Sequence, residues 1–302
     1  MLEKKQSEAF LAVVETGSFE KAGEKLCLTP SAISLRVQAL EKGLGQLLII
    51  RSKPCTLTPS GYQVLEYLKK SQRLEENFLH NLMGKSPANF FKVIIASNAD
   101  SLATWLLPTL KEVLIKNKIL LNLIMDDQAH TYSLLEKGIV NACISIESKP
   151  MKGCRSQYLG EMNYKMIATK DFTEKWFPTG INRKSLCSAP AVIFNEKDDL
   201  HFDTLTKQFG LTKGSYPFHL IPSSESFLTA IRLGLGYGMV PELQLNALSD
   251  QDKITNLMPN LGSKVQLYWH HWIQQPEYLE NITSDILKYS KLVLRPSPSN
   301  LP

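Results

Sequence analysis

The sequence lacks the features of exported, membrane-spanning and disulfide-stabilised proteins. No apolar run of about 18 or more residues occurs, so we expect no membrane span and no membrane partner. The start, MLEKKQSEAF, mixes acids and bases ahead of a short apolar run and does not resemble a signal peptide. The 5 cysteines are odd in number, scattered and never spaced as C-x-x-C, which argues against a disulfide framework or zinc cluster. These absences predict a cytoplasmic protein.

A catalytic constellation is also missing. Ser18 and Lys21 match the S-x-x-K nucleophile pattern, but no S-D-N or K-T-G partner follows, and Ser18 fits better as a helix N-cap. The segment GLGYG at 234–238 follows a helix and lacks the G-x-G-x-x-G spacing of a dinucleotide loop. His270 and His271 have no carboxylate at metal spacing, and a packed or surface pair is expected. We therefore expect no enzyme, no catalytic residue, no metal and no cofactor.

Composition is that of an ordinary folded protein. Hydrophobic residues make up 43% and charged residues 21% of the 302 positions, which suits about two globular domains. The net charge of +5 is weakly basic. Such a balance is compatible with a polyanionic partner, but many proteins that never touch nucleic acid are equally basic. Net charge alone does not decide whether the partner is a polyanion.

The first third has the pattern of a helix-turn-helix followed by a wing. A helix SEAFLAVVETG stops at Gly17, and Ser18 is placed to cap the next one. Thr29 caps a third helix with Pro30 in its first turn, where proline costs least. The following segment, LLIIRSKPCTLTPSG, reads as a short strand, a turn and a return. Three short helices with tight junctions match a DNA-binding layout.

The third helix has two contrasting faces. At helical spacing Ile33, Val37, Leu40 and Leu44 point inward, while small hydroxyl and amide side chains point outward. Such groups allow close approach to base edges, and flanking cations reach phosphate or guanine. An ordinary solvated helix is the alternative. The expected DNA contacts are Ser18, Thr29, Pro30, Ser31, Ser34, Leu35, Arg36, Gln38, Arg51 and Lys53.

A long amphipathic helix follows the wing. Its apolar stripe comprises Val64, Leu68, Leu74, Phe78 and Leu82. The stripe packs either on its own domain or, as we favour for so long a helix, against a twin in a second copy. GKSPANF at 84–90 is the best linker candidate. The predicted domains are 1–59 (winged helix-turn-helix), 60–89 (dimerisation helix and hinge) and 90–302 (effector domain).

Beyond the linker, strands and helices alternate in an α/β pattern with a mainly parallel sheet. Ligands bind beyond the carboxyl ends of the strands in such sheets. Polar residues gather at several predicted strand ends, and the acids among them favour a cationic amino acid. Capping of helices is the alternative role. The candidate effector residues are Ser97, Asn98, Asp100, Ser101, Asp126, Asp127, Asp198, Asp199, Ser223 and Ser224.

These motifs also carry a family resemblance. The turn Gly17-Ser18-Phe19, the core TPSAIS at 29–34 and the exit ALEKGLG at 39–45 resemble, in order, the winged helix-turn-helix of LysR-type transcriptional regulators. The segments FNEKDDLH, PSSESFLTAIRLGLGYGMVPE and LYWHHW look most like the ArgP/LysG branch (chromosome initiation inhibitor-like). Leu35 stands where relatives usually have glutamine or arginine, and Pro30 stands where they often have glutamine. The operator sequence therefore transfers less well than DNA binding itself.

The resemblance implies a fold and a function. The fold is α+β/α-β: an N-terminal winged helix-turn-helix, a long linker helix, and a two-lobed α/β effector domain of periplasmic-binding-protein type. The implied function is a homodimeric or homotetrameric regulator that binds double-stranded DNA, responds to lysine or arginine, controls an amino-acid exporter and can contact RNA polymerase. An architectural or replication-inhibiting DNA-binding protein without effector control is the main alternative. A solute receptor would require export.

Overall fold

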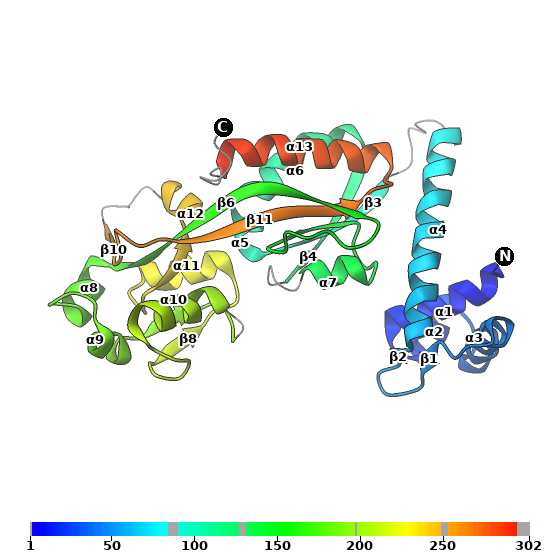
Figure 1. Cartoon of the computed structure of the whole chain (residues 1–302), viewed down its shortest axis with the longest axis horizontal. Helices are drawn as coiled ribbons and strands as arrows, with labels where there is room; N and C mark the ends of the chain where they lie inside the picture. The colour runs from blue at the N-terminus through cyan, green and yellow to red at the C-terminus, as the bar shows by residue number, and fades with distance from the viewer. Residues whose placement is uncertain (1, 84–89, 127–130, 197, 249–252, 295–302) are drawn as a thin grey trace. The chain divides into compact units, whose positions relative to one another are not determined.

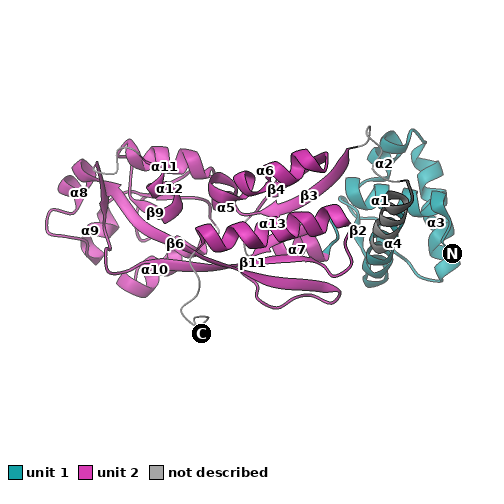
Figure 2. Cartoon of the chain, turned by 90° about the horizontal axis from the view of Figure 1, so that it is seen from above, with its two compact units in different colours: residues 1–88, 137–139 teal, residues 89–136, 140–302 magenta. Residues whose placement is uncertain are grey.

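The computed structural model describes residues 2–83, 90–126, 131–196, 198–248 and 253–294. Contacts divide the chain into two compact units, residues 1–88 with 137–139 and residues 89–136 with 140–302 (Figure 2). The predicted division at 59/60 and 89/90 stays a prediction, and the linker residues 84–89 lie outside the described ones.

The first unit contains the predicted helices and wing. Its elements are α1 (Lys4–Thr16), α2 (Phe19–Leu26), α3 (Pro30–Leu44), β1 (Ile49–Ile50), β2 (Thr56–Leu57) and α4 (Pro59–Met83) (Figure 1). Gly17 ends α1 in the left-handed conformation, with φ 67°, which a residue without Cβ adopts freely. β1 and β2 pair antiparallel and form the wing. The predicted winged helix-turn-helix is confirmed.

The core of this unit explains the order of its helices. Phe10, Ile33, Val37 and Leu40 are buried where α1 packs against α3. Leu44 is 38% exposed, so the prediction that it packs inward was wrong. The buried stripe of α3 ends with Leu40, one turn before the C-terminus of the helix. The opposite face of α3 is thereby left outside the core of the unit.

Helix α4 begins on this same core. Leu65 and Leu68 are buried in it, and Val64 packs against it. Lys69 lies 3.4 Å from a carboxylate oxygen of Glu15 on α1. At 25 residues the helix is about 37 Å long. The remaining stripe residues, Leu74, Phe78 and Leu82, have side chains outside the described ones.

The second unit has two lobes joined by long strands. The first lobe comprises β3 (Phe91–Ser97), α5 (Ala99–Ser101), the π-helical turn η1 (Leu102–Leu106), α6 (Leu107–Lys116), β4 (Ile119–Met125), α7 (Thr131–Glu136), β5 (Ala142–Ser145) and α13 (Glu277–Val293). The second comprises α8 (Lys170–Trp176), α9 (Arg183–Ser188), β7 (Ala191–Ile193), α10 (Asp199–Phe209), β8 (Phe218–Leu220), α11 (Ser224–Arg232), β9 (Gly238–Pro241), α12 (Glu242–Asn246) and β10 (Ile254–Asn256). The crossing strands β6 (Cys154–Thr169) and β11 (Ser263–Trp272) run through both (Figure 1).

Strand pairing corrects one prediction. The seven-stranded sheet has the order β10-β6-β11-β5-β3-β4, with β9 also paired to β6. Only β3–β4 and β3–β5 are parallel in it, whereas every pairing of β6 and β11 is antiparallel. The prediction of a mainly parallel sheet was therefore wrong, because β6 and β11 connect the lobes and lie antiparallel to their neighbours. The parallel pair β7–β8 lies in the second lobe.

The structure also describes the histidine pair and the helices that were considered for a metal site and a membrane span. His270 and His271 are buried, and a ring nitrogen of His270 lies 2.6 Å from the carbonyl oxygen of Glu147, as expected for a packed pair. Burial lowers the pKa of both imidazoles. Among the helices that the structure describes, none has the length and apolar character needed to cross a bilayer.

Candidate functional site

The start of α3 is fixed by side-chain caps. Thr29 accepts a hydrogen bond from the backbone N–H of Ala32 at 3.2 Å, and Ser18 caps α2 by accepting from Lys21 at 3.3 Å. Gly23 lies in α2 near the turn that leads to α3, and a Cβ on it would lie 2.6 Å from the carbonyl oxygen of Leu28. These contacts set the tight helix-turn-helix geometry, which presents the N-terminal turns of α3 outward.

Most of the predicted DNA-contact residues are exposed in the first unit. Leu35 is 66% exposed on the outer face of α3. The other exposed members are Thr29, Pro30, Ser31, Gln38, Arg51 and Lys53. Ser18, Ser34 and Arg36 are half-buried. No described segment of this unit covers the outer face of α3. Its small polar groups and Leu35 are therefore accessible to a DNA duplex whose groove receives the helix.

The wing is tied to the third helix by Arg51. Its guanidinium donates a hydrogen bond to the Ser34 hydroxyl at 3.1 Å and lies 5.0 Å from the centroid of the Phe19 ring. Arg51 thus bridges α2, α3 and the wing, and it remains exposed. A guanidinium held in this way is pre-organised to meet phosphate.

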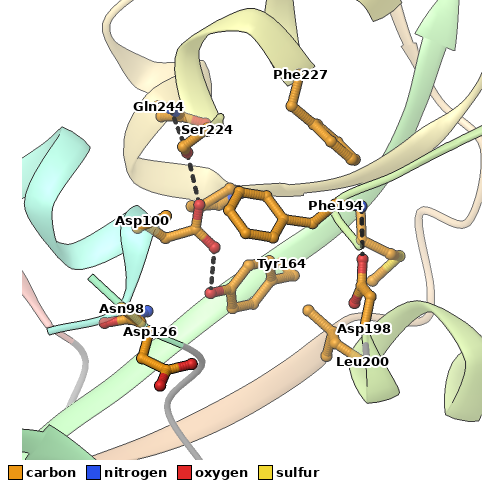
Figure 3. Close-up of a pocket in the computed structure, with 13 residues that line it drawn as sticks. Asn98, Asp100, Asp126, Tyr164, Phe194, Asp198, Leu200, Ser224, Phe227 and Gln244 are labelled. Atoms are coloured by element: carbon orange, nitrogen blue, oxygen red, sulfur yellow. Dashed lines mark hydrogen bonds between the residues drawn. The ribbon is translucent and has the colours of Figure 1, made fainter. Parts of the chain in front are cut away.

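The second unit contains a cavity where its two lobes meet (Figure 3). Five of the predicted effector residues line it, and three of them are carboxylates. The five are Asn98, Asp100, Asp126, Asp198 and Ser224. Asn98 and Asp100 follow β3 and Asp126 follows β4, whereas Asp198 and Ser224 come from the second lobe. Strand-end placement correctly predicted this gathering of polar side chains.

Asp100 is the centre of a hydrogen-bond network. Its two carboxylate oxygens accept from the Ser224 hydroxyl at 2.6 Å and the Tyr164 hydroxyl at 2.7 Å. Gln244 in turn donates to the Ser224 oxygen at 3.0 Å.

Asp126 and Asp198 place two further carboxylates on the cavity wall. The backbone N–H of Asp126 donates to the carbonyl of Ser97 at 3.2 Å, which fixes the residue at the sheet edge, and its side chain is exposed. Asp198 caps α10 by accepting from the backbone N–H of His201 at 3.2 Å, and it also accepts from that of Phe194 at 3.1 Å. Asp198 therefore combines the capping role and the cavity role.

The other predicted effector residues lie elsewhere. Ser97 and Ser101 are buried beneath the cavity wall, and Ser223 caps α11 by accepting from the Ser226 N–H at 3.4 Å. Asp199 is exposed and lines a neighbouring depression beside α10, which shares Leu200 and Met239 with the cavity. Asp127 falls outside the described residues. For Ser223 the capping alternative considered from the sequence is thus what the structure shows.

Apolar and aromatic residues of the cavity were missed by the sequence analysis. They are Tyr164, Phe194, Leu200, Phe227, Met239 and Pro241, and the amide of Gln244 was missed with them. Tyr164 lies on β6, where Met162, Tyr164 and Met166 are buried at alternate positions. That period-2 pattern is the signal that could have identified the strand. Phe194 directly precedes the NEKDDLH segment.

Chemically, the described lining of the cavity can hold a cation. Within residues 2–83, 90–126, 131–196, 198–248 and 253–294, no group of three or more His, Cys, Asp or Glu side chains is arranged to hold a metal ion. Carboxylates on both lobes with aromatic rings between them suit an organic cation.

Comparison with known proteins finds relatives that span both units. Residues 5–62 match the lysR family of bacterial regulatory helix-turn-helix proteins. The HTH-type transcriptional regulator ArgP of Photobacterium profundum is 37% identical over 283 residues, covering 94% of this chain and 95% of that protein. Among solved structures, ArgP from Mycobacterium tuberculosis has a TM-score of 0.82 at 32% identity, covering 98% of this chain and 100% of that one. Full-length LysG from Corynebacterium glutamicum with the bound effector arginine has a TM-score of 0.78 at 31% identity, covering 97% and 100%.

Proposed function

The chain belongs to the lysR family of bacterial helix-turn-helix transcriptional regulators, and from that premise we propose that arginine or lysine, bound in the cavity of Asp100, Asp126 and Asp198, controls its action on DNA. The regulator is not an enzyme. The observation that carries the proposal is the set of three carboxylates, contributed by both lobes, around one cavity. A basic amino acid has two cationic groups and so matches such a lining better than a neutral or acidic one does.

The two ends of the cavity suggest how the ligand lies. Asp100, with its hydroxyl donors, suits the compact α-ammonium group, and the Asn98 amide beside it suits the α-carboxylate. Asp198 lies on the opposite side of the cavity, beyond the ring of Phe194 (Figure 3). A guanidinium or ε-ammonium group directed toward Asp198 would pack its aliphatic stem on that ring. The relative LysG carries arginine as its effector, which supports the same class of ligand here.

On the DNA side, we propose that α3 enters the major groove. Ser31 and Gln38 would meet base edges, and exposed Leu35 would contact a thymine methyl group. Arg51 and Lys53 on the wing would bind phosphate, while the half-buried Arg36 flanks the helix. The remaining predicted contacts would hold the start of α3 and the wing in place and would lie within reach of the DNA sugar-phosphate backbone. They are Ser18, Thr29, Pro30 and Ser34.

Self-association completes the proposal. Two copies of α4 pairing along their apolar stripes would form a homodimer, or a homotetramer through a second contact, and would present two α3 helices to successive half-sites. The molecule would act in the cytoplasm. There it would contact RNA polymerase and control the expression of an amino-acid exporter. The ligand changes the assembly only by binding one arrangement of the lobes more tightly than another.

A thermal-shift screen of the twenty amino acids tests the effector assignment. A ligand at a hundred times its Kd stabilises the folded state by about 2.7 kcal/mol, which raises the midpoint by about 5–11 °C for a domain of this size. Arginine or lysine should give that shift, and citrulline and norleucine, which lack the side-chain cation, should not. Equal shifts with citrulline and arginine would contradict the role of the carboxylates. No shift with any amino acid would favour an architectural protein.

A further inference from the structure

A second polar surface lies at the outer end of the second lobe, apart from the effector cavity. We call it the basic groove. It is formed by α8, the C-terminal end of α11 with the turn that follows, and the start of β10 (Figure 1). Its lining includes Lys170, Lys175, Trp176, Arg232, Leu233 and Lys253. It shares no lining residue with the cavity of Asp100.

The charge of the basic groove is strongly unbalanced. Four cations line it, and Asp171 is the one acid among the described lining residues. Lys170, Lys175 and Lys253 are exposed and form no ion pair with a carboxylate in the described part of the chain. Repulsion among these positive charges raises the free energy of the unbound surface. Binding of a polyanion relieves that repulsion and is therefore favoured.

Apolar groups lie among these cations. Lys175 is held with its ammonium group 5.4 Å from the Trp176 ring centroid, and the half-buried indole forms part of the wall. Leu233 is 72% exposed. It is held there by the turn that ends α11, in which Gly234 has φ 76° and its N–H donates to the Ile231 carbonyl at 2.9 Å. The turn thereby directs a large apolar side chain into solvent beside Arg232.

This combination distinguishes between two kinds of anionic partner. A phosphate backbone needs cations and hydrogen-bond donors but gains little from an exposed leucine or a tryptophan wall. An acidic polypeptide with apolar side chains among its carboxylates uses both the charges and the apolar surface, as interfaces commonly combine an apolar anchor with a charged rim. Charge complementarity and the exposed Leu233 therefore favour a peptide.

We propose that the basic groove is a docking site for an acidic, leucine-bearing polypeptide segment of a partner protein. Lys170, Lys175 and Lys253 would bind its carboxylates, and Trp176 with Leu233 would bind its apolar side chain. The basic groove contains none of the residues that line the effector cavity and none of the predicted DNA contacts. It gives the regulator a place to meet another protein while α3 is on DNA.

The test uses the full chain and an acidic synthetic peptide of aspartate and glutamate residues around a central leucine, labelled for fluorescence anisotropy. Binding should saturate and weaken as salt rises. Emission from Trp176 should shift to shorter wavelength, since Trp105, Trp269 and Trp272 are already buried. The combined variant Lys170→Glu, Lys175→Glu, Lys253→Glu should lose at least tenfold in peptide affinity.

Matched variants keep the result interpretable. Lys111→Glu, Lys116→Glu, Lys152→Glu makes the same charge change at exposed lysines outside the groove and should leave the Kd within twofold. Leu233→Ser should weaken the peptide several-fold, and a peptide with serine in place of leucine should lose the same factor. Unchanged melting curves establish that each variant folds. Equal loss in both lysine variants, no binding at all, or equally effective competition by inorganic phosphate or random duplex DNA would overturn the proposal.

Discussion

The hydroxyl of Ser224 donates a 2.6 Å hydrogen bond to Asp100 and so links the second lobe to the first across the cavity. Asp100 follows β3 in the first lobe, and Ser224 begins α11 in the second. A ligand ammonium group that binds Asp100 would therefore act at the contact through which the lobes are joined. This gives a cationic amino acid a direct means of favouring one arrangement of the lobes.

Replacement of Asp100 by Asn should weaken arginine binding at least tenfold. The substitution keeps the size of the side chain but removes the charge, and a charge-assisted hydrogen bond contributes about 1.5–3 kcal/mol. Isothermal titration calorimetry of the full chain measures the change. Asp203→Asn, at an exposed residue paired with Lys207 outside the cavity, is the control and should bind arginine normally. An unaltered affinity in Asp100→Asn would exclude this carboxylate from the site.

Asp198 allows capping and ligand binding to be separated. Asn caps helices about as well as Asp but has one acceptor oxygen where Asp198 uses two, so Asp198→Asn should lower the melting midpoint less than Asp198→Ala does and still lose arginine affinity. Asp198→Ala removes the acceptor for the His201 and Phe194 N–H groups and should also cost about 1 kcal/mol of stability. Calorimetry and thermal melting of the pair give the two quantities. If the Asp198→Asn variant bound arginine as the parent does, Asp198 would be a cap alone.

Arg51→Ala should weaken binding to every duplex. The change removes a cation from the wing and releases Ser34, so we expect about a five- to tenfold loss and a salt-dependence slope smaller by about one. Lys53→Ala, which removes a cation without that contact, should weaken binding to all duplexes alike and flatten the salt dependence. Fluorescence anisotropy with promoter and random duplexes at several salt concentrations measures both. A changed sequence preference in Lys53→Ala would contradict the phosphate assignment.

His201 should make the second lobe sensitive to acid. Its imidazole is fully buried against Tyr216 and Tyr237, with ring centroids 5.9 Å and 6.0 Å away, and burial lowers its pKa to about 4. The unfolded chain takes up the proton near pH 6.5, before the folded one does, so stability falls as the pH drops from about 6.5 toward 4. Between pH 7 and 5 the loss is on the order of 2 kcal/mol.

Chemical denaturation of His201→Phe at both pH values tests this dependence. The variant keeps an aromatic ring in the cluster but cannot take up a proton, so its stability should fall less between pH 7 and pH 5 than that of the parent. His219→Phe, which replaces an exposed histidine, is the control and should follow the parent. A parental pH dependence in His201→Phe would assign the effect to other groups.

Local signals explain which parts of the fold were predictable. Gly17, the caps Ser18 and Thr29, and the apolar spacing of Ile33, Val37 and Leu40 are all encoded within one or two helical turns, and they predicted the first unit correctly. The positions of Asp100 and Asp126 followed from strand ends alone. Their common location needed only the rule that such ends meet at one sheet edge.

Long-range packing explains what was not predicted. Tyr164 reaches Asp100 because β6 crosses between the lobes, and Gln244 reaches Ser224 from the short helix α12. Neither contact has a spacing in the sequence that reveals it. The parallel expectation for the sheet failed for the same reason, since β11 comes from the end of the chain and inserts between β5 and β6. Asp199 follows Asp198 directly, yet only the latter lines the cavity.

The most direct test of the account is the affinity of the purified full chain for DNA from upstream of its own coding region, measured with and without arginine or lysine. We predict that this DNA is bound more tightly than random duplex of equal length, and that arginine or lysine, but not citrulline, alters the affinity or the footprint. Asp100→Asn should keep the preference and lose the response. Equal binding to both duplexes, unaffected by either amino acid, would contradict the account.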